Sequence, residues 1–110
     1  MKVQAITKHV RISPSKVRDV TREIQGLPAV RALDMVQFMP LKAARLVFKT
    51  LRSAIANAEH NSSLSRESLM VKEAVVGTGV TLKRVSSRAR GSSSMLRKRS
   101  SHIKIVLSDK

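Results

Sequence analysis

The segment from Val80 to His102 most restricts what this chain can fold into. It contains no acidic residue, and its cations are spaced through serine and glycine: Lys83, Arg84, Arg88, Arg90, Arg97, Lys98 and Arg99. A segment with so few large apolar side chains does not bury enough surface to offset the entropy lost on ordering it. We therefore expect it to gain its order from an acidic partner.

The flanks of this segment predict strands. Residues 69–79 read as a strand interrupted by Gly77 and Gly79, and Ile103, Ile105 and Leu107 recur at every second position, as one face of a strand requires. A structureless loop of this length is improbable inside a compact domain. We expect an extended hairpin that turns near residues 89–91. Arms of about a dozen residues would span roughly 40 Å, well beyond a body whose radius of gyration is about 13 Å.

Charge and composition point to a polyanionic partner. The net charge is +15, from 22 Lys and Arg against 7 Asp and Glu, which would make a free compact protein repel itself. The basic residues do not fall on one long amphipathic helix, and no apolar run approaches the length of a membrane span, so nucleic acid is favoured over a membrane. The only aromatic side chains are Phe38 and Phe48, which nearly rules out a platform that stacks unpaired bases.

The absence of cysteine excludes disulfides and thiolate metal sites. No positively charged start followed by an apolar stretch marks a secretory signal. We therefore expect the protein to work inside a cell.

The remainder of the chain predicts a strand and three helices around one modest core. Residues 2–12 are expected to form a strand whose alternation slips near Thr7. Ser13 is expected to cap a helix over residues 14–25, with Pro14 at its first position and Gly26 as its stop. A shorter helix follows from Pro28 and ends before Pro40.

The third helix, over residues 41–60, has the clearest pattern. One apolar stripe faces the core: Ala44, Val47, Phe48, Leu51, Ile55 and Ala58. A second stripe at the same spacing is basic: Lys42, Arg45, Lys49 and Arg52. A basic stripe of this kind is usually only solvated, but here it could also face a polyanion, and the same two readings apply to Lys16, Arg18 and Arg22 on the first helix.

The sequence contains no pattern of residues that is typical of an active site. His9, His60 and His102 lie far apart in the sequence and the carboxylates are scattered, without a glycine-rich phosphate loop, a paired acid or a metal-ligand spacing. We expect no catalytic residue, no metal, no cofactor and no enzymatic activity. His102 lies where the basic segment returns to the body, where it could donate to a phosphate or cap the strand.

The basic segment suits phosphate recognition. Five of its seven cations are arginines, whose planar guanidinium matches phosphate oxygens with two hydrogen bonds. If all seven contacted phosphates, affinity would fall by roughly three decades between 50 and 200 mM salt. The alternative is a flexible basic linker, which the strand-like flanks disfavour.

Several segments together resemble one known family. VRISPSKVR (10–18), SAIANAEHN (53–61), LKR (82–84), RARG (88–91) and KRSSHI (98–103) are similar to recurring segments of the bacterial-type large-subunit ribosomal protein numbered twenty-two, and the resemblance covers essentially the whole chain. It implies an α+β fold of three helices packed on a small antiparallel sheet, with a long protruding β-hairpin. The single domain, 1–110, would comprise a globular body, 1–79 and 102–110, and an extended basic hairpin, 80–101.

The resemblance also implies a function. The chain would be a structural constituent of the large ribosomal subunit that binds its rRNA, supports assembly and lines the polypeptide exit tunnel with its hairpin tip. The rRNA-binding set comprises Arg11, Ser13, Lys16, Arg18, Lys83, Arg84, Arg88, Arg90, Arg97, Lys98, Arg99 and His102. The tunnel-lining set comprises Arg88, Ala89, Arg90 and Gly91.

The implied partners are large-subunit rRNA, neighbouring large-subunit proteins and the nascent polypeptide at the tip, without a membrane and without homo-oligomers. The location would be the cytoplasmic ribosome, with a plastid ribosome not excluded. Charge alone would also fit a general nucleic-acid chaperone or a DNA-architectural protein, and more remotely a membrane-active cationic protein.

Overall fold

The computed structural model describes residues 2–79, 81–87, 91 and 93–109. Strand β1 (Lys2–Val10) leads into helices α1 (Pro14–Ile24), α2 (Ala29–Gln37) and α3 (Lys42–Asn61). A short 3-10 turn, η1 (Arg66–Ser68), precedes strands β2 (Met70–Thr78), β3 (Leu82–Ser87), β4 (Ser93–Lys98) and β5 (Ser101–Ser108). The expected class, three helices on a small antiparallel sheet, is confirmed.

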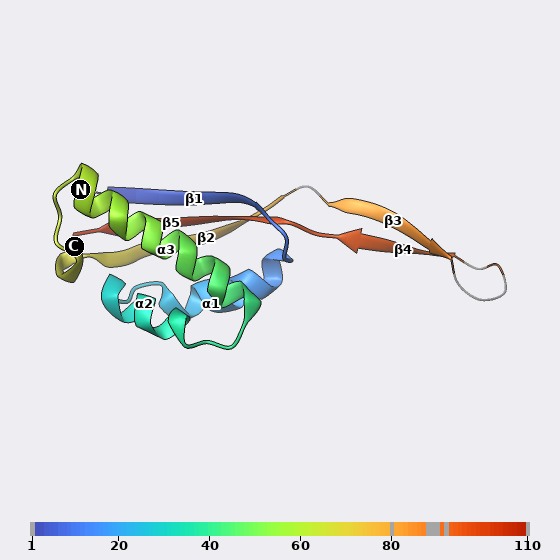
Figure 1. Cartoon of the computed structure of the whole chain (residues 1–110), viewed down its shortest axis with the longest axis horizontal. Coiled ribbons are helices and arrows are strands. Elements are labelled where there is room, and N and C mark those ends of the chain that lie inside the picture. The colour runs from blue at the N-terminus through green and yellow to red at the C-terminus, as the bar shows by residue number, and fades with distance from the viewer. Residues whose placement is uncertain (1, 80, 88–90, 92, 110) are drawn as a thin grey trace.

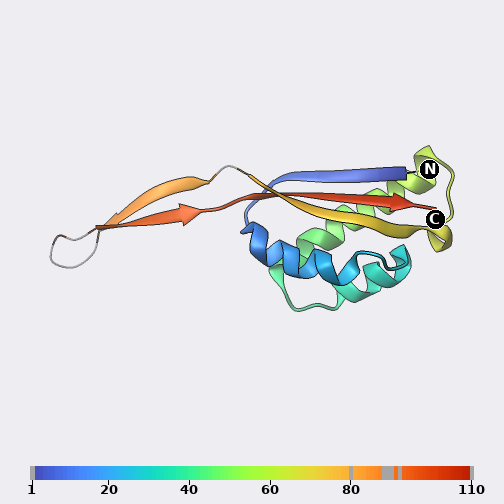
Figure 2. The same cartoon turned by 180° about the vertical axis from the view of Figure 1, so that it is seen from behind.

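Two sheets are built from these strands. The first has the order β1-β5-β2, so β5 is the central strand and pairs antiparallel with both neighbours. The second is the antiparallel pair β3-β4, in which Leu82 lies opposite Lys98 and Ser87 opposite Ser93. Figures 1 and 2 show this pair extending away from the helices along the long axis, and the molecule measures 62 × 24 × 17 Å.

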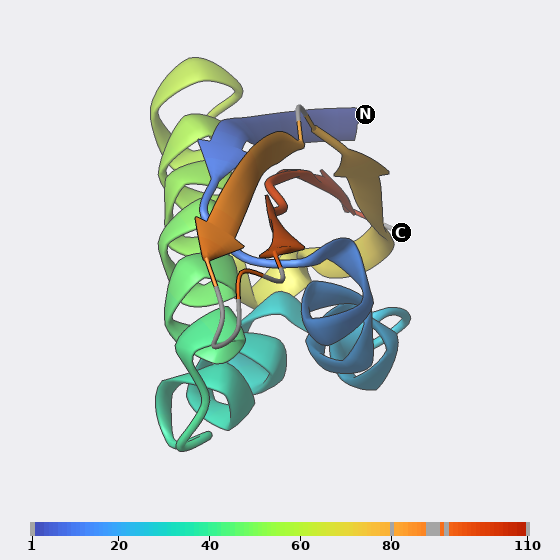
Figure 3. The ribbon, with the colours of Figure 1, turned by 90° about the vertical axis from the view of Figure 1, so that its right-hand side faces the viewer.

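The helices cover one face of the three-stranded sheet (Figure 3). Helix α3 packs on β1 and β5, α1 packs on β2, and α2 packs mainly on α3. The core lies between the sheet and the helices. The side chains of Ile103, Ile105 and Leu107 on β5 are completely buried there, together with Val17 on α1 and Leu51 on α3. On the opposite face of the sheet, Ile6 and Val75 are about half exposed, whereas Val106 of the central strand is buried.

The helix bounds follow the sequence signals closely. Pro14 opens α1, and Gly26 follows its last turn at a φ of +88°, a conformation that favours glycine. The apolar stripe of α3 is buried except at Phe48, which is half-buried, and its basic stripe is exposed. The prediction that Ser13 caps α1 through its hydroxyl is wrong: Ser13 occupies the capping position, but its side chain makes no capping hydrogen bond and lies 3.5 Å from the Ser15 hydroxyl.

The slip in the alternation of the first strand corresponds to a bulge. The register of β1 against β5 shifts between Thr7 and Val10, and His9 within the shift has a φ of +59°. Such a bulge bends the strand and twists it more strongly. It ends the regular pairing just before the chain turns into α1, and it places His9 against the start of β5.

Candidate nucleic-acid interface

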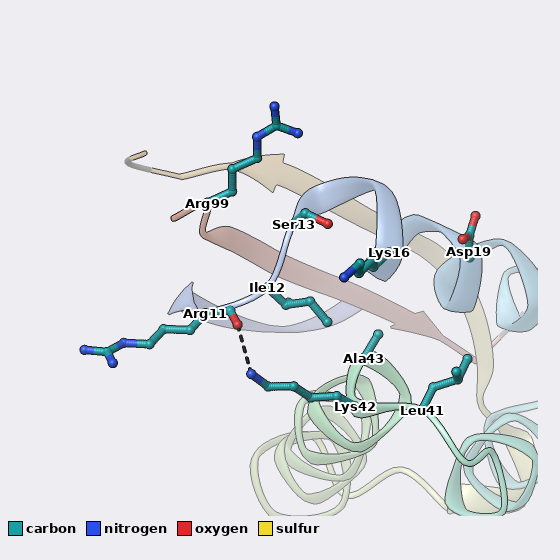
Figure 4. Close-up of a pocket in the computed structure, with 9 residues that line it drawn as sticks. All are labelled: Arg11, Ile12, Ser13, Lys16, Asp19, Leu41, Lys42, Ala43 and Arg99. Atoms are coloured by element: carbon teal, nitrogen blue, oxygen red, sulfur yellow. Dashed lines mark hydrogen bonds between the residues drawn. The ribbon is translucent and has the colours of Figure 1, made fainter. Parts of the chain in front are cut away.

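The ends of several elements meet beside the root of the β3-β4 pair and form a hollow of about 810 Å³. We call it the basic hollow, and it is lined by Arg11, Ile12, Ser13, Lys16, Asp19, Leu41, Lys42, Ala43 and Arg99. These residues come from the link between β1 and α1, the first turns of α1, the start of α3 and the residue pair between β4 and β5. Residues distant in sequence thus gather four cations around one depression (Figure 4).

One hydrogen bond holds two sides of the hollow together. The Lys42 ammonium at the start of α3 donates to the Arg11 carbonyl oxygen at 3.1 Å. Figure 4 shows the Arg11 and Arg99 side chains pointing outward from the rim, and both are exposed. Asp19 is the only carboxylate among the lining residues and lies at one end, so the hollow is electropositive.

Two helices begin at this hollow, and each adds to its preference for anions. Neither α1 nor α3 has an acidic residue in its first turn, although carboxylates are favoured there by the helix dipole. The first backbone N–H groups of a helix have no partner within the helix and point toward its N-terminus. Cationic side chains therefore lie beside unpaired amides, an arrangement that suits a phosphate.

The root of the hairpin is tied to the body by specific contacts. The Gly79 N–H donates to the Ser100 carbonyl at 3.0 Å, and the fully buried Ser101 hydroxyl donates to the Ile12 carbonyl at 2.6 Å. The His9 N–H donates to Nδ1 of His102 at 3.1 Å, and the two rings meet edge to face with centroids 5.0 Å apart.

These contacts give His102 a structural role at the start of β5, and its expected contact with a phosphate stays a prediction. Its Nδ1 is an acceptor, so the neutral imidazole carries its proton on Nε2. The side chain fixes the bulge of β1 against the start of β5 and keeps one N–H available as a donor. No sequence pattern indicated that His9 would be its partner, because the pairing depends on the positive φ of the bulge.

Apart from His102, the predicted rRNA-binding residues fall into three groups. Arg11, Ser13, Lys16 and Arg99 lie together at the basic hollow. Arg18 lies farther along α1, where its guanidinium donates to the Val76 carbonyl at 3.4 Å. Lys42, which the sequence assigned only to a basic stripe, also lines the basic hollow. Its position as the first residue of α3, directly after Leu41, is the sequence signal that could have placed it there.

The third group belongs to the hairpin. Lys83 lies opposite Arg97 and Arg84 opposite Leu96 in the β3-β4 register, while Lys98, the last residue of β4, is exposed. Gly91 has a φ of +74°, a conformation suited to a turn. Arg88, Ala89 and Arg90, and with them most of the expected turn, lie outside the described residues.

Two other kinds of site find no support in the part of the chain that the structure describes. There, no three side chains of His, Cys, Asp or Glu gather where they could hold a metal ion. None of the helices described is both long and apolar enough to cross a membrane.

Comparison with known proteins identifies the relatives of this chain. A family model described as ribosomal protein L22p/L17e matches residues 5–108. A large ribosomal subunit protein uL22 from Akkermansia muciniphila is 50% identical over 109 residues, covering 99% of this chain and 97% of the relative. The protein of the same name from Opitutus terrae is 52% identical, covering 99% and 96%, and that from Chloroflexus aggregans is 48% identical, covering 100% and 97%. The resemblance seen in the sequence is thereby confirmed, and this chain belongs to the ribosomal protein L22p/L17e family.

Proposed function

We propose that this protein is a structural constituent of the large ribosomal subunit that binds large-subunit rRNA through the basic hollow and the β3-β4 hairpin. The observation that carries the proposal is the hollow itself, where Arg11, Lys16, Lys42 and Arg99 surround the N-termini of two helices with one carboxylate at the edge. Phosphate is the anion that uses cations and free backbone amides together. The relatives are named as large ribosomal subunit proteins, which is why we propose the RNA of that subunit as the source of the phosphates.

The hairpin extends this surface away from the body. Its root leaves the body beside the basic hollow, and Lys98 and Arg99 are exposed where β4 meets β5. A chain of cations that begins on a packed body and continues along a narrow antiparallel pair can follow RNA into spaces too small for a globule. We infer that the pair stabilises the packing of rRNA segments during assembly.

The finer assignments belong to the same proposal. The tip, Arg88 to Gly91, would line the polypeptide exit tunnel and meet the nascent chain. The body, 1–79 and 102–110, would lie on rRNA beside neighbouring large-subunit proteins, as one copy per subunit in a cytoplasmic or plastid ribosome. The remaining members of the predicted rRNA-binding set, including Arg18 and His102, would contribute further contacts to phosphate and sugar.

Charge reversal at the hollow tests the proposal. The variant Lys16→Glu/Lys42→Glu places carboxylates where phosphates would lie, whereas the matched control Arg31→Glu/Lys49→Glu reverses two exposed cations of α2 and α3 that do not line the hollow. Each lost phosphate contact lowers the slope of log affinity against log salt by about 0.7 to 0.9. We expect the hollow variant to lose about 1.5 from the slope for large-subunit rRNA, and the control to lose less than half of that.

Three results would contradict the proposal. One is an equal effect of the two variants, because the basic hollow would then be no more than a solvated surface. Another is equal affinity of the natural protein for duplex DNA and for folded rRNA, which would favour a general nucleic-acid chaperone. The third is release of the protein from large subunits in a salt wash that leaves other core proteins bound.

A further inference from the structure

The connection between α2 and α3 exposes an apolar ring that the fold does not use. Phe38, one of only two aromatic residues in the chain, is 80% exposed just after the last residue of α2, and Leu41 before α3 is 54% exposed. Most exposed apolar side chains on small proteins need no explanation, but neighbouring large ones mark contact sites. The ring is held out on a short connection between two packed helices.

A second hollow, of about 500 Å³, lies at this connection. We call it the aromatic corner, and its lining includes Met39, Pro40, Leu41, Lys42, Arg45 and Phe48. The Arg52 guanidinium lies 5.6 Å from the centre of the Phe48 ring, close enough for a cation–π interaction. No carboxylate is among the residues that line the corner.

The aromatic corner is continuous with the basic hollow. Leu41 and Lys42 line both depressions, and Lys42 is fixed between them by its hydrogen bond to the Arg11 carbonyl. A polyanion seated on Lys16 and Lys42 would therefore continue into the aromatic corner, which is also lined by Gln37 and Met39, the two sequence neighbours of the exposed Phe38. Rings and apolar side chains beside cations match a nucleotide, which combines a flat base with a phosphate.

We propose that one unstacked RNA base stacks on the exposed Phe38 ring, next to the aromatic corner, with Lys42 and Arg45 of the corner on the adjoining phosphates. The inference rests on the proposed function, because it places the base on the same RNA that occupies the basic hollow. Two phenylalanines are too few for an extended platform of rings, but one exposed ring is enough for a single base. A contact with an acidic protein segment is the competing assignment.

Tryptophan fluorescence tests the stacking directly. The chain has no Trp and no Tyr, so Phe38→Trp introduces a single reporter at the ring position, and Val75→Trp places a control reporter on the sheet face opposite the helices, where Val75 is 49% exposed. The probes are a single-stranded oligoribonucleotide and an oligomer of equal length with abasic sites. We expect the base-containing RNA to quench the reporter at position 38 much more than the abasic strand does, and to leave the reporter at position 75 nearly unchanged.

Affinity for large-subunit rRNA supplies the second readout. Stacking on one ring is worth roughly fivefold to a hundredfold in affinity, so Phe38→Leu should weaken binding about tenfold while Phe38→Tyr stays close to the natural protein. Because Phe38 is exposed, both variants should have the same midpoint of thermal unfolding as the natural protein. Leucine keeps the apolar character and removes only the flat ring.

The outcomes separate this inference from the proposed function. Equal binding by Phe38→Leu and the natural protein, or equal quenching by the two oligomers, would overturn the stacking and leave rRNA binding intact. An emission change that requires purified large-subunit proteins and does not occur with RNA would also overturn it, in favour of a protein contact. A natural protein that does not bind rRNA would overturn both proposals.

Discussion

The three-stranded sheet and the β3-β4 pair follow each other along the chain from β2 to β5. They differ in burial, because the helices pack against the three-stranded sheet and not against the pair. In β5, Ile103, Ile105 and Leu107 are completely buried, and α3 packs on this strand. In β3, Leu82 is 46% exposed, and Lys98 at the end of β4 is exposed as well. An isolated two-stranded hairpin is marginally stable in water. We infer that the body folds by burying its own apolar surface, and we expect the β3-β4 pair to depend on an external surface.

The largest expected effect comes from removing an apolar side chain in the covered region. Ile105→Ala deletes a fully buried side chain from the central strand and should lower the free energy of unfolding by about 2 to 5 kcal/mol. Leu82→Ala, in the uncovered pair, should change it by less than about 0.5 kcal/mol. Urea unfolding followed by circular dichroism measures both. Similar losses in the two variants would mean that the hairpin is part of the core.

A smaller effect is expected at the junction of the two regions. A Cβ on Gly79 would lie 2.5 Å from the Ser100 hydroxyl oxygen, 3.2 Å from the Ser100 carbonyl carbon and 3.3 Å from Cε1 of His102. The hydroxyl can rotate away but the backbone cannot, so Gly79→Ala should destabilise the protein by about 1 to 3 kcal/mol. The matched control is Gly77→Ala, whose Cβ would meet only the Cβ of His102 at 3.8 Å.

The outcome at the two glycines also shows whether the junction is specific. We expect Gly79→Ala to weaken rRNA binding in addition, because it displaces the start of β5 and with it the Arg99 side of the basic hollow. If Gly77→Ala and Gly79→Ala behaved alike in unfolding and binding, the close approach at the root would have no mechanical role.

The smallest of these effects is expected for one buried hydrogen bond. Ser101→Ala removes the donor to the Ile12 carbonyl and should cost about 1 kcal/mol, since a part-buried acceptor is left without its partner. The control Ser53→Ala, on an exposed position of α3, should stay within about 0.5 kcal/mol of the natural protein. No difference between the two serines would show that water satisfies the carbonyl equally well.

Much of the body could be predicted from the sequence because its signals are local. Periodic apolar residues and Pro14, Gly26, Pro28 and Pro40 place the helices to within two residues, and every second residue of β5 points into the core as expected. The prediction that the chain is not an enzyme is confirmed by its family, whose members are structural components.

The parts that could not be predicted depend on contacts between distant segments. The pairing of His9 with His102 requires a bulge with a positive φ, and the joining of Lys42 to Arg11 requires the packing of α3 against the end of β1. In the sequence Phe38 is only one of two aromatic residues, because nothing in its neighbours indicates that its ring stays exposed. Composition gives the number of aromatic rings but does not determine which of them are exposed in the folded protein.

Backbone amide hydrogen exchange tests the central contrast most directly. In the free protein, we expect the amides of β5 to exchange slowly, near the rate set by global unfolding, and those of β3 and β4 to exchange orders of magnitude faster. Addition of large-subunit rRNA should slow exchange in β3 and β4 and leave β5 almost unchanged. Protection of β3 and β4 equal to that of β5 in the free protein would contradict the claim that RNA gives the hairpin its order.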